Sequence, residues 1–142
     1  TNTKLHLIEP MGFRLSEKHL KRAGMDYWKS VDLAVYDNYQ EFLEENNNPK
    51  IYMATTKAVK SYTEVKYESD CYIMFGKESA GIPEEILLSN KENCIRIPMV
   101  GDIRSLNLGN SAAIILYEAL RQNNFQGMNI EGDLHQHDWS EA

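Results

Sequence analysis

The sequence predicts an α/β domain, with a mostly parallel sheet that carries helices on both of its faces. Short runs rich in β-branched and aromatic residues alternate along the chain with segments that have the composition and end signals of helices. Several of the strand-like runs are almost continuously hydrophobic, which is typical of parallel strands covered on both faces. With 142 residues, of which 42% are hydrophobic, the chain is long enough for one domain with its own core.

The strands and helices are expected in alternation from the N-terminus. Strands are predicted at residues 5–8, 31–36, 51–55, 71–75 and 94–98. Helices are predicted at residues 16–23, 38–45, 83–88 and 107–123. Gly24 follows the first helix, as glycine often does, and Asn38 and Glu41 have the spacing of a capping box at the start of the second. The last helix is so apolar that it must be buried, either in the core or against a partner subunit.

The domain is expected to cover residues 1–127 and to be followed by an acidic, mobile tail over residues 128–142. The tail holds four acidic residues and no Lys or Arg, so it carries −4 of the formal net charge of −6. The remaining chain is nearly neutral and includes two locally basic stretches, around Lys21 and Arg22 and around Lys57 and Lys60. Such stretches are more often solvated surface than an RNA-binding patch, and both interpretations stay open.

Several kinds of site are excluded by their spacing. A phosphate loop needs Lys and then Ser or Thr after its last glycine, but Ile82 and Pro83 follow Gly81. No G-x-G-x-x-G triplet follows a predicted strand, so a classical dinucleotide site is not expected. His135 and His137 stand in a polar tail without a third ligand of fixed geometry, and no metal is expected there.

The location of the protein is predicted from what the chain does not contain. No apolar stretch approaches the roughly 20 residues that cross a bilayer. Cys71 and Cys94 stand among β-branched or aromatic residues in predicted strands, where a free thiol behaves as a small hydrophobic group. We therefore expect a cytoplasmic protein with reduced cysteines and no membrane partner.

Two segments carry most of the functional signal, residues 75–85 and residues 95–122. Each joins a strand-like run to a glycine- or asparagine-rich bend and then to a helix. In α/β proteins, ligands bind in bends of this kind, at the carboxyl ends of the strands. The chemistry is therefore expected in these two bends.

These segments also carry a resemblance to a known family. The sequences FGKESAGIP and IRIPMVGDIRSLNLGNSAAIILYEALRQ, together with HLIEPMGF, LKRAGMDYW and ATTK, resemble the SPOUT superfamily of RNA methyltransferases. Within it, the chain is most similar to the small single-domain tRNA 2′-O-methyltransferases that modify the wobble cytidine or uridine of leucine tRNAs. The resemblance covers nearly all of residues 5–127.

The resemblance implies a fold, a cofactor and partners that composition alone does not predict. The fold would contain a C-terminal trefoil knot, which is rare among proteins in general. The cofactor would be S-adenosyl-L-methionine, converted to S-adenosyl-L-homocysteine when its methyl group moves to a ribose 2′-hydroxyl. The partners would be a second copy of the chain, in a homodimer, and the anticodon stem-loop of a tRNA that binds the face shared by the two copies.

The resemblance also implies which residues hold the cofactor. Gly76 would let the backbone approach it closely, although an ordinary turn would equally require glycine there. Ile97 and Met99 would offer apolar surface to the purine ring. The implied cofactor-binding residues are Ala54, Gly76, Ile97, Met99, Ser105 and Leu106.

Further residues are implied in catalysis and in RNA binding. Tyr117 would lie near the reacting ribose, and Arg121 would contact RNA; alternatively they are a core aromatic residue and a charge that stabilises the helix C-terminus. Glu78 is either an acid beside the transfer site or a loop residue that caps the next helix. The implied catalytic residues are Tyr117, Glu78 and Asn107, and the implied substrate-binding residues are Arg121, Arg22 and Lys21.

One departure from the family pattern leaves the activity open. Relatives begin with a further strand and an N-T-G-N-type motif ending in an arginine, and this chain is expected to begin just after that motif, at Thr1. A cofactor-binding RNA module without catalytic activity is therefore the alternative to an active methyltransferase. A small α/β protein of another function, such as a nucleotide-binding regulator, is the third possibility.

Overall fold

The computed structural model describes residues 1–11, 30–101 and 105–141, and within them all five predicted strands are present. β1 (Leu5–Ile8) pairs with β2 (Leu33–Tyr36). In a second sheet, β3 (Ile51–Ala54) lies between β4 (Tyr72–Phe75) and β5 (Cys94–Ile95). Every pairing is parallel, which confirms the predicted class. The described strands form two hydrogen-bonded sheets and not a single one.

Three of the four predicted helices lie within the described residues. They are α2 (Tyr39–Glu45), α3 (Glu84–Ser89) and α4 (Leu108–Gln122), with short 3-10 helices η2 (Lys91–Asn93) and η3 (Trp139–Glu141). The helix predicted at residues 16–23 falls outside the described residues. Asn38 caps α2 through its side-chain oxygen, which accepts from the amide of Glu41 at 2.9 Å. Glu41 reaches back to the amide of Asp37, one residue earlier than the predicted capping box requires.

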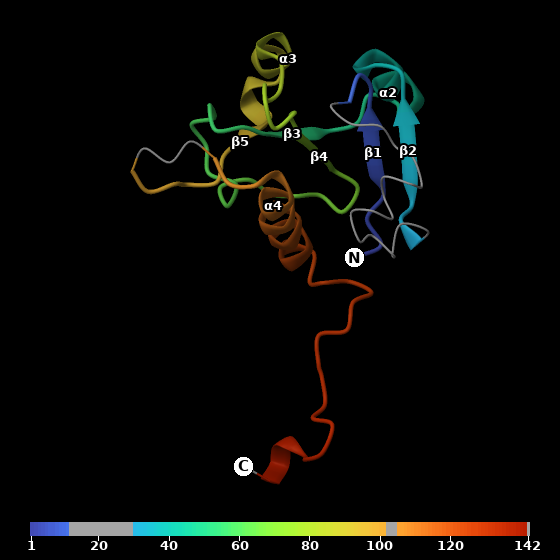
Figure 1. Cartoon of the computed structure of the whole chain (residues 1–142), viewed down its shortest axis with the longest axis vertical. Helices are drawn as coiled ribbons and strands as arrows, with labels where there is room; N and C mark the ends of the chain where they lie inside the picture. Colours follow the sequence, from blue (N-terminus) through green and yellow to red (C-terminus); the bar gives the residue numbers. More distant parts are fainter. Residues whose placement is uncertain (12–29, 102–104, 142) are drawn as a thin grey trace.

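The three-stranded sheet is covered on both faces, as the sequence predicts. Alternate residues of β3 point to opposite sides, because successive side chains of a strand do so. Ile51 and Met53 pack in a core with side chains of α2 and α3. Tyr52 packs in a second core with Ile115 and Ala119 of α4. Figure 1 shows α3 and α4 on opposite sides of β3, β4 and β5.

A cluster of aromatic side chains joins the two sheets. The ring of His6 in β1 lies 5.2 Å from that of Tyr72 in β4 and 5.5 Å from that of Phe42 in α2, measured between centroids. His6 Nδ1 is 2.9 Å from the hydroxyl of Tyr36. Burial lowers the pKa of His6, so the imidazole is neutral at pH 7. Side-chain packing thus holds the β1–β2 pair against the larger sheet.

Residues 55–71 form the long connection between β3 and β4. This connection leaves β3, and the amide of Tyr62 then donates to the carbonyl of Arg96, just beyond β5, at 2.9 Å. Farther on, the side-chain amide of Gln122, the last residue of α4, bonds the carbonyl of Val65 and the amide of Tyr67, both at 3.0 Å. The connection then enters β4, on the other edge of β3. It therefore contacts both β5 and α4, an arrangement consistent with the threading that the resemblance implies.

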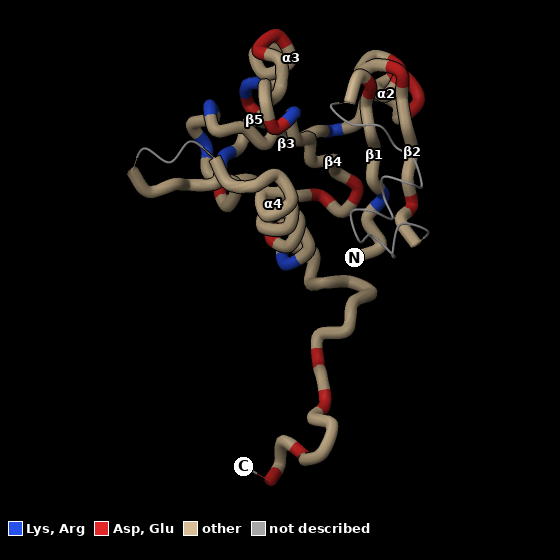
Figure 2. The backbone as a smooth tube through the Cα atoms, in the orientation of Figure 1, with Lys and Arg blue, Asp and Glu red and all other residues tan. Residues whose placement is uncertain are grey.

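The remaining features concern the tail, membranes and metals. Residues 128–141 extend away from the domain, and their acidic residues lie far from the Lys and Arg residues near β3 and β5 (Figures 1 and 2). Among the described residues, none of the helices has the length and apolar character needed to cross a bilayer. Across the same residues, no three His, Cys, Asp or Glu side chains gather in a way that could hold a metal ion.

Replacing Gln122 is expected to loosen the long connection from α4. Gln122→Ala removes the partners of the Val65 carbonyl and the Tyr67 amide, and a half-buried polar group without a partner lowers the free energy of unfolding by about 1 to 3 kcal/mol. Urea denaturation followed by circular dichroism measures the change. Gln126→Ala, an exposed neighbour beyond the helix, is the matched control and should leave stability unchanged. Equal stability of the two variants would contradict this account.

Candidate functional site

A pocket of about 670 Å³ lies where the three strands of the larger sheet end. Because β3, β4 and β5 are parallel, their carboxyl ends meet at one edge, and the segments that follow them form the walls. The start of α4 closes the remaining side. This volume is in the range of small-molecule sites. The lining residues are 54–57, 75–82, 95, 97, 99, 105–108, 111 and 115.

The wall after β3 is a short turn fixed on β5. The amide of Thr55 donates to the carbonyl of Ile95 at 2.9 Å, which continues the parallel pairing by one residue. The hydroxyl oxygen of Thr55 accepts from the amide of Lys57 at 3.3 Å. Ala58, directly after the turn, is buried. The turn therefore holds its place through backbone bonds and a buried methyl group, and leaves Thr56 and Lys57 exposed at the pocket.

The wall after β4 is a loop that folds back on itself. The amide of Gly81 donates to the carbonyl of Lys77 at 2.8 Å, and the amide of Lys77 donates to the carbonyl of Gly81 at 3.3 Å. A Cβ atom on Gly76 would lie 2.0 Å from the carbonyl carbon of Gly81, so no larger residue fits. Gly81 has a φ of +72°, in the region that favours glycine. Both glycines are therefore required by the loop itself, and Glu78 lies at its exposed tip.

The wall after β5 combines apolar side chains with the cap of α4. Ile97 packs in the second core, with Ile95 and Ile115 among its members. The side-chain oxygen of Asn107 accepts from the amide of Asn110 at 3.2 Å, so this oxygen is used to start the helix. Ser111 and Ile115, one turn apart, extend the wall along α4. The surface offered to a ligand is thus apolar at its base and polar at its rim.

The structure brings most of the predicted site residues together. Eight of them line the pocket: Ala54, Gly76, Glu78, Ile97, Met99, Ser105, Leu106 and Asn107. Lys21 and Arg22 lie outside the described residues. Tyr117 and Arg121 are described, but they are not part of the pocket wall.

Tyr117 and Arg121 lie on the outer face of α4. Each residue of an α-helix advances by about 100°, so Tyr117 points away from the side that carries Ser111 and Ile115. Half of the Tyr117 residue surface is exposed, at 50%. Arg121 makes two hydrogen bonds to the carboxylate of Glu118, at 2.8 and 2.9 Å, which lower the pKa of Glu118 to about 2. Neither side chain reaches the pocket of its own chain.

Some wall residues were not predicted as site residues. Ser111 and Ile115 could have been found from their spacing, because they lie four and eight residues after Asn107 on the same helix face. The turn residues Thr55 to Lys57 follow directly on Ala54, so they belong to the same bend. Ile82 carried no such signal, since it lies at the pocket and is also buried in the first core.

Comparison with known proteins identifies relatives of the chain. A family model described as the SpoU rRNA methylase family matches residues 1–117. The tRNA (cytidine(34)-2′-O)-methyltransferase of Escherichia coli (strain K12) is 42% identical over 128 residues, which are 89% of this chain and 82% of that protein. A relative from Listeria monocytogenes serotype 4b (strain F2365), to which the same activity is provisionally assigned, is 50% identical over 128 residues. These residues are 88% of this chain and 76% of that protein.

Solved structures agree with these relatives. One, from a study of 2′-OH methylation of C/U34 on tRNA, has a TM-score of 0.78 and 40% identity and covers 87% of this chain and 80% of its own. Another, an AdoMet-bound rRNA methyltransferase from Sinorhizobium meliloti, has a TM-score of 0.69 and 26% identity and covers 83% of this chain and 45% of its own. The fold of this chain is therefore similar to that of a protein that binds AdoMet, which is S-adenosyl-L-methionine.

Gly76→Ala is expected to destabilise the pocket loop. The added methyl group would meet the backbone of Gly81, which cannot move without breaking its two bonds to Lys77. Forcing such an overlap costs about 1 to 3 kcal/mol of unfolding free energy. Chemical denaturation measures it, with Gly132→Ala as control, because a Cβ on Gly132 meets nothing within 4 Å. A Gly76→Ala variant as stable as the control would show that the loop does not need glycine here.

Proposed function

The chain belongs to the SpoU rRNA methylase family, and we propose that it transfers a methyl group from S-adenosyl-L-methionine to the ribose 2′-hydroxyl of nucleotide 34 of a tRNA. The observation that carries this proposal is the convergence of eight predicted residues on one pocket at the carboxyl edge of the sheet. The wobble cytidine or uridine of leucine tRNAs is the proposed target. The cytoplasm, where tRNA is found, is the proposed location.

The pocket has the chemistry that this cofactor needs. Ile97, Met99 and Ile115 offer apolar surface for a purine ring. The segment from Ser105 to Leu108 presents backbone groups at the exposed rim, where polar edges of a ligand are bound. The carboxylate of Glu78 lies on the opposite wall, and within the described part of the chain it forms no ion pair. Its negative charge suits a positively charged ligand.

In the methyl-transfer reaction, the protein must mainly align the ribose hydroxyl with the methyl group and accept the proton of that hydroxyl. When bound, the cofactor supplies a methyl group on a positively charged sulfur atom. A ribose hydroxyl is a weak nucleophile at neutral pH, so it must be held within about 3 to 3.5 Å of that methyl group, with a partner for its proton. We assign these tasks to Glu78, as acceptor for the hydroxyl proton, and to the Asn107 side-chain amide, whose nitrogen stays available as a donor while its oxygen caps α4.

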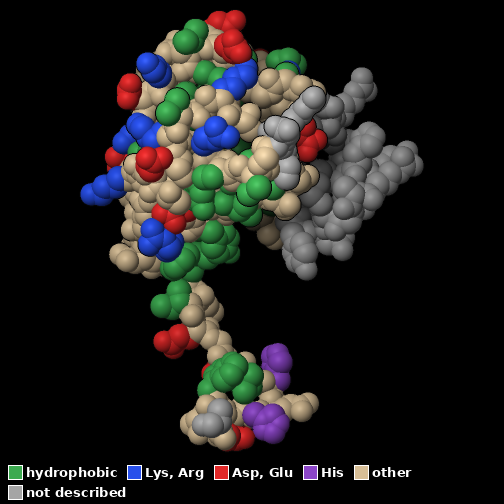
Figure 3. All heavy atoms as spheres, turned by 90° about the vertical axis from the view of Figure 1, so that its left-hand side faces the viewer, with side chains coloured by type: hydrophobic (Ala, Val, Ile, Leu, Met, Phe, Trp, Pro, Cys, Tyr) green, Lys and Arg blue, Asp and Glu red, His purple; other side chains and the backbone are tan. Residues whose placement is uncertain are grey.

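A homodimer is proposed because large apolar side chains are exposed on the outer face of α4 and just before the helix. Ile114 and Tyr117 are exposed by 36% and 50%, and Leu106 by 36%. Figure 3 shows hydrophobic side chains gathered between the charged part of the domain and the base of the tail. A second copy that covers this face would bring Tyr117 and Arg121 of each chain to the shared surface. There they would meet the anticodon stem-loop, with Lys21 and Arg22 as further proposed contacts.

Methyl transfer from labelled S-adenosyl-L-methionine to unmodified total tRNA tests the proposed function directly. Nuclease digestion then locates the labelled nucleotide. The expected result is label on a 2′-O-methylated nucleotide 34, with Glu78→Gln strongly reduced in rate and still folded. Cofactor binding without transfer to any RNA would instead support the cofactor-binding module, and the proposed reaction would be wrong.

The homodimer is tested with a charge on the outer face of α4. Ile114→Asp places a carboxylate in the proposed apolar interface, where burial of an unpaired charge is strongly unfavourable. Light scattering coupled to size-exclusion chromatography should show a dimer for the natural chain and a monomer for the variant. Leu88→Asp on α3, where Leu88 is 78% exposed, is the control and should stay dimeric. A natural chain that is monomeric at all concentrations would contradict the proposal.

A further inference from the structure

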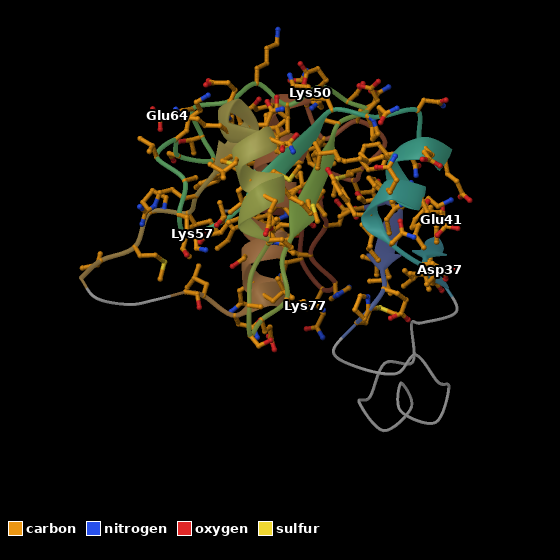
Figure 4. The ribbon with its side chains drawn as sticks, turned by 90° about the horizontal axis from the view of Figure 1, so that it is seen from above. Asp37, Glu41, Lys50, Lys57, Glu64 and Lys77 are labelled. Atoms are coloured by element: carbon orange, nitrogen blue, oxygen red, sulfur yellow. The ribbon has the colours of Figure 1, made fainter. Side chains whose placement is uncertain are left out.

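An ion pair links the pocket wall after β3 to the first residue of α3, directly after the wall that follows β4. The Nζ atom of Lys57 forms a hydrogen-bonded ion pair with the carboxylate of Glu84. Lys57 belongs to the turn after β3, which lines the pocket, and Glu84 directly follows the loop at residues 76–83 after β4 and is the first residue of α3. Figure 4 shows Lys57 and Lys77 projecting from these two segments. The pair therefore spans the rim between two loops that are separate in sequence.

We propose that the Lys57–Glu84 ion pair is a clasp that positions these two loops and thereby sets the affinity of the pocket for S-adenosyl-L-methionine. The proposal rests on the proposed function, because it takes that cofactor as the ligand. Glu84 acts as a positioning residue, because it is not part of the pocket wall, whereas Lys57 also lines the pocket itself.

The surroundings of the two residues make the clasp effective. Each loop is anchored at its base, the first by the Thr55–Ile95 backbone bond and the second by Ile82, which is buried in the core. The exposed tips between these anchors, residues 56–57 and 77–80, both line the pocket. The ion pair links the Lys57 tip to Glu84, just beyond the Ile82 anchor, and so fixes the first tip relative to the base of the second loop.

The Glu84 carboxylate is ionised at neutral pH. The hydrogen bond from Lys57 lowers the pKa of Glu84, so the carboxylate stays ionised down to acidic pH. Both side chains are more than half exposed, at 55% and 72%. Exposed pairs are weak and are screened by salt, so the clasp is expected to change affinity by a small factor that salt removes.

The same two strands carry a second ion pair that serves as a matched control. Lys50 lies just before β3 and pairs at 2.6 Å with Glu68, which precedes β4. These side chains are 46% and 45% exposed. This pair ties the chain segments at the opposite, amino-terminal edge of the sheet, away from the pocket. Unlike the Lys57–Glu84 pair, this pair lies away from the site, and the hydroxyl of Tyr52 also donates to Glu68 at 3.2 Å.

The test is isothermal titration of the full chain with S-adenosyl-L-methionine, in about 0.1 M and about 1 M salt. Glu84→Gln keeps the size of the side chain and removes its charge. We expect it to bind about two- to fivefold more weakly at the lower salt concentration, and to approach the natural chain at the higher one, where the screening length is about 3 Å. Glu84→Asp, which keeps the charge and leaves the pocket wall unaltered, should bind within about twofold of the natural chain. Glu68→Gln should bind as the natural chain does.

The outcomes separate the clasp from the proposed function. Unchanged binding by Glu84→Gln at low salt, equal weakening by Glu68→Gln, or weakening by Glu84→Asp as large as that by Glu84→Gln would each overturn the clasp and leave the proposed function standing. Failure of the natural chain to bind the cofactor would overturn both. Thermal unfolding of each variant, expected to match the natural chain within a few degrees, shows that a change in affinity does not arise from loss of the fold.

Discussion

The parallel pairing of β3 with both β4 and β5 is the constraint on which the site depends. It brings three carboxyl ends to one edge, so that segments separated by tens of residues become walls of one pocket. Alternation along β3 then supplies two cores, with α3 on one face and α4 on the other. The connection at residues 55–71 contacts the segment after β5 and the end of α4 before it enters β4, on the other edge of β3.

Much of the fold was predictable because its signals are local. The hydrophobic runs located every described strand to within a few residues, and Asn38 marked the cap of α2. The division into two hydrogen-bonded sheets was not predictable, since it depends on which strand edges meet. The bonds of Gln122 with Val65 and Tyr67 were equally hidden, because they join side chain to backbone across more than fifty residues. Long-range pairings of this kind leave no periodic pattern in a sequence.

The site, too, was predictable in some of its residues and not in others. Resemblance and bend chemistry identified eight wall residues, and the structure gathers them in one place. Gly76 was expected to let the backbone approach a ligand. The structure gives a further reason for glycine there, because the backbone of Gly81 lies where a Cβ atom would be. The outward direction of Tyr117 could not be deduced without knowing which face of α4 meets the sheet. The Lys57–Glu84 pair joins residues 27 positions apart, and charge spacing gave no sign of it.

The measurement that tests this account most directly is amide hydrogen exchange of the full chain with and without S-adenosyl-L-homocysteine. The account predicts that ligand slows exchange in the segments after β3, β4 and β5 and at the start of α4. A second hollow, lined by Tyr39 and Leu43 of α2 and Ile86 of α3, lies on the other face and provides an internal comparison. Protection confined to that hollow, or none at the carboxyl edge, would contradict the assignment of the site.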